Sequence, residues 1–340
     1  MNGDWLIRGR DGRFCGYTLA PEGDAVLCRT ERTPGGPWSA PRTVGGDQRL
    51  HPVLAVARSA NGYAHLVSWR PTVPGESGLV HSTHFQSHLA ALDWTPLGHP
   101  NKKGDRTGPP AVAVDAQGRA HVFVRNRGGG VSMRAQLEKG GWGPWRDLKG
   151  SRVHGELTAV AGESGLITLC ASAPDTILCW RQREAGATPQ EDKPLSFGAR
   201  AGTLRALATS PARTTLFFTG EDDVVYAWRP DDEPVPLLAA AGPGPLAAVR
   251  CLLDDVDCTV LAQRASSGRV AFAAYPTEQE SAGAWWTESG PRLPQDAAIG
   301  LSVDADGDIV AATVSPSTGQ WLVTRRKDEP GLALRPWQPV

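Results

Sequence analysis

Residues 109–150 read PPAVAVDAQGRAHVFVRNRGGGVSMRAQLEKGGWGPWRDLKG and contain four short segments typical of β-strands. Small, β-branched and aromatic residues alternate within them, and the turn signals Asp115–Gly118 and Gly128–Gly130 lie between them. This pattern is that of half-buried antiparallel strands. A sheet of about forty residues cannot cover both of its faces alone, so we expect copies of it. The predicted strands are Ala111–Val114, Ala120–Arg125, Val131–Leu137 and Trp145–Leu148.

The same order of segments recurs along the whole chain, at intervals of roughly 40 to 56 residues between the markers of the closing strands. Repeats of this length with four strands each are typical of propeller blades. The sequence therefore predicts an all-β fold, a seven-bladed β-propeller with four antiparallel strands per blade, as one domain over residues 1–340. The markers are Trp38, Trp94, Trp145, Leu195, Leu237, Trp286 and Trp337. The expected blades are 4–46, 51–98, 109–150, 155–198, 203–241, 245–291 and 297–340.

Composition and charge exclude several classes of partner. The formal net charge is −1 and the chain has no basic stripe, so we expect no nucleic acid as a partner. No apolar run approaches the roughly 18 residues of a membrane span, so we expect no membrane partner. The first residues, MNGDWLIRGRDG, lack the pattern of a signal peptide, and we expect a cytoplasmic location.

Six cysteines form three pairs, each centred on a predicted turn. Each pair is therefore expected to lie across one hairpin. Three disulfides or a thiol switch are one interpretation; small apolar residues that fill the sheet are the other, which we favour because no secretion signal is present. The chain has no CxxC sequence, which gives a structural zinc site little support. The pairs are Cys15 with Cys28, Cys170 with Cys179, and Cys251 with Cys258.

The histidines offer a second candidate metal motif. His81, His84 and His88 form HSTHFQSH, a spacing that would align metal ligands on a helix. On the strand predicted here, an offset of three places His81 and His84 on opposite faces, so we expect a solvated strand end and no metal. His65 and His121 occupy matching places in consecutive blades. Cys15, Thr168, Thr215, Cys258 and Val310 fill that place elsewhere, which favours a structural position.

The innermost strands carry small residues where they face the axis, with three exceptions. Trp5, Arg205 and Arg250 interrupt this pattern. A buried guanidinium needs a partner, so the two arginines either pair with Asp or Glu side chains or bind an anionic ligand. Thr158 and Ser302 lie on the same predicted face. These five residues form a candidate axial site.

The runs GRAHVFVR (118–125) and GGWGPWRDLKG (140–150), with GYAHLVSW (62–69) and LDWTPLG (92–98), resemble the bacterial PLL-type, tectonin-like lectins. That resemblance implies a seven-bladed propeller that binds fucose or other sugars at blade junctions. A tryptophan offers an apolar face for sugar C–H groups and an N–H for a hydroxyl, although it also serves as packing. The positions matching the family's tryptophan motif are Trp38, Trp94, Trp142, Trp145, Trp286 and Trp337.

Three functions stay open at this point: a lectin-like protein for a carbohydrate or small ligand, an enzyme with one axial active site, and a protein-interaction scaffold. The blades have diverged too far for seven equal sites, so avidity from repetition is not expected. No catalytic, phosphate-binding or dinucleotide motif is present, so the enzyme of this alternative would be a cofactor-independent, biosynthetic enzyme of specialised metabolism. Similar pockets at Trp94 and Trp145 would favour the lectin. An axial pocket in which Arg205 or Arg250 lacks a carboxylate would favour the enzyme.

Overall fold

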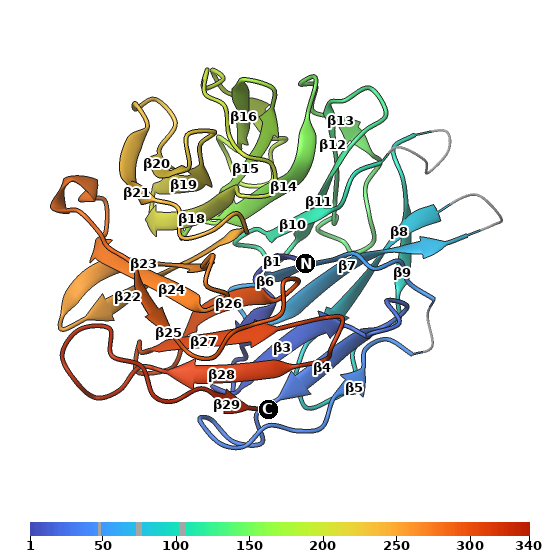
Figure 1. Cartoon of the computed structure of the whole chain (residues 1–340). Coiled ribbons are helices and arrows are strands. Elements are labelled where there is room, and N and C mark those ends of the chain that lie inside the picture. The colour runs from blue at the N-terminus through green and yellow to red at the C-terminus, as the bar shows by residue number, and fades with distance from the viewer. Residues whose placement is uncertain (47–48, 73–76, 102–106) are drawn as a thin grey trace.

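The computed structural model describes residues 1–46, 49–72, 77–101 and 107–340, and these form seven antiparallel sheets around a central axis (Figure 1). Each sheet contains four strands that are joined in chain order, and the second sheet gains a fifth strand at its inner edge. One short 3-10 helix, η1 (Glu280–Ala282), is the only helix of the described residues, and it is far too short to cross a membrane. The prediction of an all-β, seven-bladed propeller is confirmed.

The strands are described blade by blade, from the axis to the rim. Blade 1 contains β2 (Leu6–Arg8), β3 (Phe14–Leu19), β4 (Val26–Thr30) and β5 (Arg42–Thr43), and blade 2 contains β6 (Leu54–Arg58), β7 (Ala64–Pro71), β8 (Ser77–His84) and β9 (Thr95–Gly98). Blade 3 contains β10 (Ala111–Val114), β11 (Ala120–Arg125), β12 (Val131–Ala135) and β13 (Arg146–Asp147), and blade 4 contains β14 (His154–Ala161), β15 (Ile167–Ala173), β16 (Thr176–Arg181) and β17 (Gln190–Glu191). Blade 5 contains β18 (Arg205–Ser210), β19 (Arg213–Thr219), β20 (Val224–Trp228) and β21 (Val235–Ala239). Blade 6 contains β22 (Leu246–Leu253), β23 (Val256–Arg264), β24 (Val270–Pro276) and β25 (Thr287–Ser289). Blade 7 contains β26 (Ala298–Val303), β27 (Ile309–Val314), β28 (Trp321–Arg325) and β29 (Gln338–Pro339).

Register between the first two strands of a blade follows the sequence pattern in six blades. His65 lies opposite Ala57 and His121 opposite Ala113, as their matching places predict. Blade 6 differs, because Thr259 and not Cys258 lies opposite Arg250. Its hairpin turns on Asp254 and Asp255 alone, both with positive φ, which is the geometry of a two-residue turn. The shorter turn moves the register by one residue.

All three cysteine pairs lie across hairpins, as predicted. Cys170 and Cys179 form a disulfide, so our preferred interpretation of unbonded cysteines is wrong for this pair. The other four cysteines are free and buried, as that interpretation expects. Disulfides persist mainly in oxidising compartments, whereas a cytoplasmic location remains a prediction.

The N-terminal segment lies at the axis of the ring (Figure 1). Its strand β1 (Asn2–Gly3) pairs in parallel with β6 of blade 2. The Asn2 side-chain amide donates to the carbonyl oxygens of Pro110 (3.1 Å) and Leu157 (2.8 Å), which belong to blades 3 and 4. Gly3 is required here, because a Cβ would lie 2.1 Å from the Val56 oxygen. The chain thus fills its own axis and ties three blades together.

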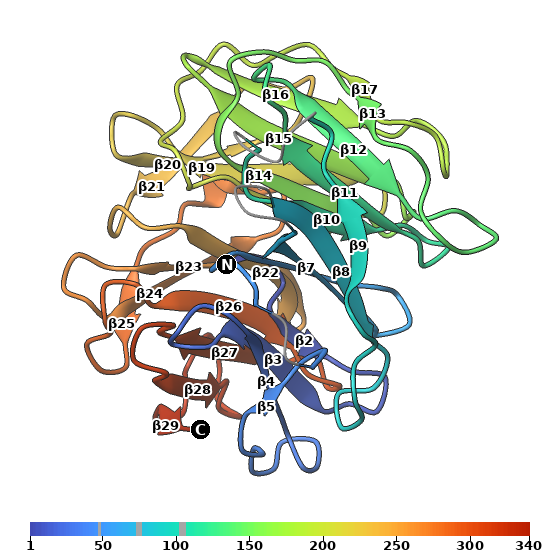
Figure 2. The same cartoon turned by 90° about the vertical axis from the view of Figure 1, so that its right-hand side faces the viewer.

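Blades 1 and 7 meet side by side without sharing a strand (Figures 1 and 2). Trp321 of blade 7 contacts two tryptophans of blade 1, Trp5 edge-on at 5.6 Å and Trp38 at 5.9 Å between ring centroids. Gly16 leaves room for the Trp321 ring, since a Cβ there would lie 2.2 Å from it. An ion pair between Arg325 and Glu31 spans the same junction. Side-chain packing therefore closes the ring.

We expect Gly16→Ala to destabilise the protein by about 1–3 kcal/mol, because the new methyl group displaces the Trp321 ring from a filled core. Gly244→Ala is the matched control, since a Cβ at that position meets nothing within 4 Å and its φ is not positive. Urea unfolding of both variants measures the difference. Equal stability of the two variants would contradict the packing role of Trp321.

Candidate functional site

Three of the predicted junction tryptophans hold neighbouring blades together. Each donates its indole N–H to a backbone carbonyl near the outer strand of the preceding blade. The Trp94 ring is buried, whereas Trp145 and Trp286 are half-buried. Trp337 makes a similar contact with the Ser289 hydroxyl at 3.1 Å. The three carbonyl contacts are Trp94 to Val44 (3.2 Å), Trp145 to Leu97 (3.2 Å) and Trp286 to Ala239 (2.7 Å).

Blade 4 makes the same contact from a different strand. Trp180, on the third strand of this blade, donates to the Leu148 carbonyl at 2.9 Å and is fully buried. Sequence reasoning missed this residue because the search followed the closing strands. The signal that marks such a contact is a glycine on the preceding blade: a Cβ at Gly150 would lie 2.7 Å from the Trp180 ring, and one at Gly45 would lie 2.3 Å from Trp94.

Trp38 and Trp142 belong to a second class of tryptophan. Each forms an isolated β-bridge with the residue that follows the third strand of its blade, Trp38 with Glu31 and Trp142 with Gln136. Our alignment of Trp38 with the closing strands is therefore wrong, because β5 begins only at Arg42. Trp142 packs edge-on against His81, with the ring centroids 5.0 Å apart. Trp38 is half-buried and lines a cavity.

That cavity lies at the junction of blades 7 and 1 and has a volume of about 530 Å³. Its size is within the range of small-molecule sites. Blade 1 supplies residues 35–38 and the Glu31 carboxylate. Blade 7 supplies the Arg325 guanidinium and residues 335–336 and 338–340, at the end of the chain. The residues with side chains suited to a polar ligand are Glu31, Trp38, Thr324, Arg325, Arg335 and Gln338.

Glu31 is 1% exposed, and its carboxylate is held from three sides. One oxygen, Oε2, accepts the N–H groups of Phe14 (2.9 Å) and Gly35 (3.2 Å). The other, Oε1, accepts from the Arg325 guanidinium. A carboxylate offers about four acceptor positions, and these contacts use three of them.

Arg325 is fixed by its surroundings and still has free donors. Its guanidinium lies over the Phe14 ring, 5.3 Å from the centroid. Besides Glu31, it donates to Asp304 Oδ2 at 3.4 Å. A guanidinium carries five N–H donors in a fixed plane, so donors remain for a ligand beside the pre-aligned carboxylate.

The junction of blades 4 and 5 lacks this combination of charged pair and aromatic ring in its described cavity. A cavity of about 300 Å³ between blades 4 and 5 gathers three arginines and two aspartates, but its lining contains no aromatic ring. Between blades 5 and 6, Arg229 is held by Glu280 at 2.7 and 2.9 Å and is largely buried. The positions equivalent to Arg325 in blades 1 to 6 are Thr30, Thr83, Ala135, Arg181, Arg229 and Tyr275.

Both arginines of the predicted axial site have carboxylate partners. Arg205 pairs with Asp4 of the N-terminal segment. Arg250 pairs with Asp257 at 2.7 Å and with Glu163 at 2.9 Å. The pairing alternative is thus the one that the structure shows. An arginine without a carboxylate partner, the feature that would have favoured an axial enzyme, is therefore missing from this site in the described residues.

The structure brings together only part of that axial site. Trp5, Thr158 and Arg205 line a cavity of about 70 Å³, well below the size of a typical small-molecule site. Thr158 is engaged as well, since its hydroxyl accepts the Ala206 N–H at 3.1 Å. Arg250 and Ser302 do not belong to the lining of this cavity.

The histidines of β8 are buried, so our expectation of a solvated strand end is wrong. His81 and His84 lie on opposite faces, as predicted, and are 4% and 3% exposed. His81 lies 3.0 Å from His65 of the neighbouring strand, and the two rings stack. Burial lowers the pKa of His65 to about 4 and that of His81 to about 3, where the nearby His65 adds to the shift. His84 lies on the other face of the strand and contacts the Tyr17 hydroxyl of blade 1.

Comparison with known proteins gives fold neighbours only. No protein-family model and no curated protein matches the sequence. The BP39L lectin of Burkholderia pseudomallei has a similar structure, with a TM-score of 0.73 and 14% identity over 100% of this chain and 99% of the lectin. The Aleuria aurantia lectin, in complex with Fucα1-6GlcNAc, has a TM-score of 0.54 and 14% identity over 85% and 95% of the two chains.

An enzyme is also among the similar structures. The sialidase of Trypanosoma rangeli, in complex with the inhibitor DANA, has a TM-score of 0.52 and 8% identity over 88% of this chain and 55% of the sialidase. At such identities the likeness extends to the fold alone, and the fold is one that lectins share.

We expect the free energy of unfolding to fall as the pH drops from about 6.5 toward 4. The unfolded histidines titrate near 6.5, whereas His65 and His81 stay neutral when folded, so the unfolded state binds more protons in this window. Each histidine contributes up to about 1.4 kcal/mol per pH unit. Urea unfolding at several pH values measures the slope. The control is the double variant His65→Thr with His81→Met, because Thr168 and Met133 hold the equivalent positions in blades 4 and 3. Its unfolding free energy should depend less on pH. The same slope in the double variant and the unaltered protein would contradict the assignment of this pH dependence to His65 and His81.

Proposed function

We propose that this propeller binds a carbohydrate at the junction of blades 7 and 1. The observation that carries the proposal is the Glu31–Arg325 ion pair beside the half-buried Trp38 in a cavity of about 530 Å³. We further propose that the chain is related to the PLL-type lectins, whose blade-junction tryptophans its sequence resembles.

The chemistry of the junction suits a sugar. The Trp38 face offers apolar surface to ring C–H groups, and the carboxylate and guanidinium offer an acceptor and donors to neighbouring hydroxyls. Both charged groups are already hydrogen-bonded in place, so little side-chain entropy is lost on binding. The Aleuria lectin is complexed with a fucose-containing disaccharide, which makes fucosides the first ligands to test.

The divergence of the other junctions supports one site of this kind. Acid–arginine pairs also join Arg181 with Asp231 and Arg229 with Glu280, but the cavity beside Arg181, Arg229 and Asp231 has no tryptophan in its lining. A single site gives no avidity from repetition within the chain. We therefore expect one sugar bound per chain.

The test is a glycan array followed by calorimetric titration with the best binder, starting from α-methyl fucoside. Trp38→Ala should weaken binding at least tenfold, about 1.4 kcal/mol, because the sugar loses its apolar platform. Arg325→Lys should weaken it similarly, since an ammonium cannot replace the planar guanidinium over Phe14.

Trp142→Ala is the matched control, because Trp142 forms the equivalent bridge in blade 3, where the neighbouring blade 2 has Thr83 at the position of Arg325. It should bind sugar like the unaltered protein. Thermal unfolding of each variant separates lost binding from lost structure. No binding to any glycan, or binding lost in Trp142→Ala and kept in Trp38→Ala, would refute the proposed site.

A further inference from the structure

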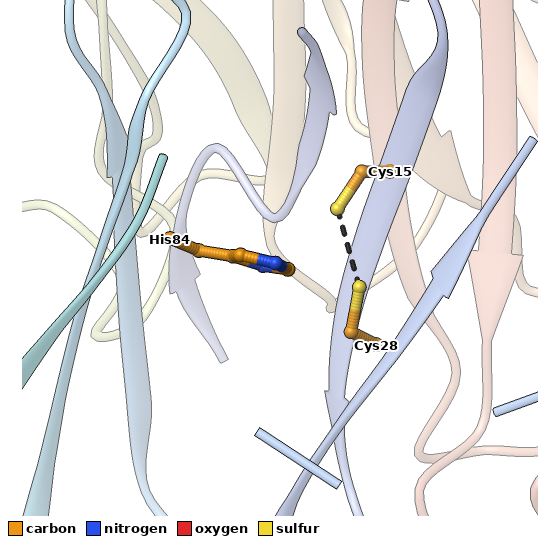
Figure 3. Close-up of side chains that lie close together, drawn as sticks. All are labelled: Cys15, Cys28 and His84. Atoms are coloured by element: carbon orange, nitrogen blue, oxygen red, sulfur yellow. Dashed lines mark hydrogen bonds between the residues drawn. The ribbon is translucent and has the colours of Figure 1, made fainter. Parts of the chain in front are cut away.

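Two cysteines and a histidine from different blades meet in the core between blades 1 and 2 (Figure 3). Cys15 lies on β3, Cys28 on β4 and His84 at the end of β8. The two sulfur atoms are 3.3 Å apart, and both sulfurs and a histidine nitrogen lie within 4.8 Å of one another. All three side chains are at most 3% exposed. Bulk water therefore does not reach this group.

The orientation of His84 is that of a metal ligand. Its Nε2 is 2.9 Å from the Leu89 carbonyl oxygen and so carries the proton. Its Nδ1 is then an acceptor and lies 2.8 Å from the Tyr17 hydroxyl, which donates to it. Histidines that bind metals commonly donate their second N–H to a backbone carbonyl in this way, which fixes the ring and the free nitrogen.

The other cysteine pairs show that this arrangement is not a general feature of the sheet. Cys170 and Cys179 are bonded to each other. Cys251 and Cys258 are free and lie directly opposite one another, yet no third ligand joins them. Over residues 1–46, 49–72, 77–101 and 107–340, the group of Cys15, Cys28 and His84 is the only one with three ligand atoms this close.

We propose that Cys15, Cys28 and His84 form a binding site for a thiophilic divalent cation, with Zn²⁺ as the prototype. Thiolates and imidazole are the donors that zinc prefers, at about 2.3 and 2.0 Å. In a tetrahedral site the sulfurs would be about 3.8 Å apart, so they need to separate by only about half an ångström. The Tyr17 hydroxyl, already at Nδ1, is a neighbouring oxygen donor for the fourth position.

Charge balance favours the ion over bare thiolates. Binding forms two Zn–S bonds and one Zn–N bond and releases the two thiol protons to solvent, while the Tyr17 hydroxyl gives up its hydrogen bond to Nδ1. A dication with two thiolates and a neutral imidazole has no net charge, which a dry core tolerates far better than a lone thiolate. No oxidant or reductant takes part.

The site also has a structural rationale in the register of the blades. His84 holds in blade 2 the position that Glu31 holds in blade 1, one residue beyond Thr83 and Thr30. At the junction of blades 7 and 1, Arg325 faces Glu31. At the junction of blades 1 and 2, the residue in the position of Arg325 is Thr30, whose hydroxyl donates to the Ser87 carbonyl at 2.9 Å. A bound ion would join the two blades at this position.

The experiment begins with the unaltered chain, reduced briefly and kept anaerobic. Co²⁺ should bind one per chain and give a thiolate-to-cobalt charge-transfer absorption, and Zn²⁺ should displace it and raise the melting temperature. Cys15→Ala with Cys28→Ala should abolish the absorption. His84→Ala should weaken Zn²⁺ binding at least about tenfold.

Two matched controls come from the same chain: Cys251→Ala with Cys258→Ala, and Cys170→Ala with Cys179→Ala. Both should bind the ion like the unaltered protein. A reduced unaltered chain without the charge-transfer absorption would overturn the proposal, and this result does not depend on the folding of any variant. Absorption that persists without Cys15 and Cys28, or a Cys15–Cys28 disulfide with no metal binding in anaerobically purified protein, would overturn it as well.

Discussion

Each blade of a propeller has two apolar faces, which its two neighbouring blades cover. One face of the first blade and one face of the last blade are covered only if these two blades meet. In this chain no strand is shared across that contact, so side chains must supply it. Trp321 packs between Trp5 and Trp38, Gly16 leaves room for its ring, and Arg325 reaches Glu31 at the outer end. Three of the residues that close the ring, Trp38, Glu31 and Arg325, also line the cavity of about 530 Å³. Packing that must form for the fold to be stable also holds the candidate site in place.

The axis of the ring is occupied by the chain itself, which leaves a cavity of only about 70 Å³ there. Asn2 bonds to blades 3 and 4, and Asp4 neutralises Arg205. Of the two alternatives that the sequence left open for this guanidinium, a carboxylate partner or an anionic ligand, the structure shows the carboxylate partner. With its charge matched and little space left beside it, the axis serves stability. The junction of blades 7 and 1 keeps the larger cavity, with Arg325 and Glu31 in its lining.

Local chemistry determined what the sequence could predict. The alternation and turn residues of 109–150 predict β10 and β11 to the residue, because strand and turn preferences act over a few neighbours. The cysteine hairpins follow for the same reason. Contacts between blades are different, since they depend on loop length and on which side chain crosses a junction. Trp38 and Trp94 look equivalent by spacing but occupy different positions, and Trp180 makes its contact from another strand. No spacing rule brings His84 to Cys15 and Cys28.

The seven junctions have the same backbone geometry and different chemistry, which argues for specialisation of single junctions. At one register position, blades carry threonine, alanine, arginine or tyrosine. The junction of blades 7 and 1 has a cavity lined by arginine, glutamate and tryptophan, and among the described residues only the junction of blades 1 and 2 gathers two thiols and an imidazole. Because each blade is held by its own backbone pairing, one junction can change without loss of the others. A repeated scaffold of this kind permits unique sites at separate places on one ring.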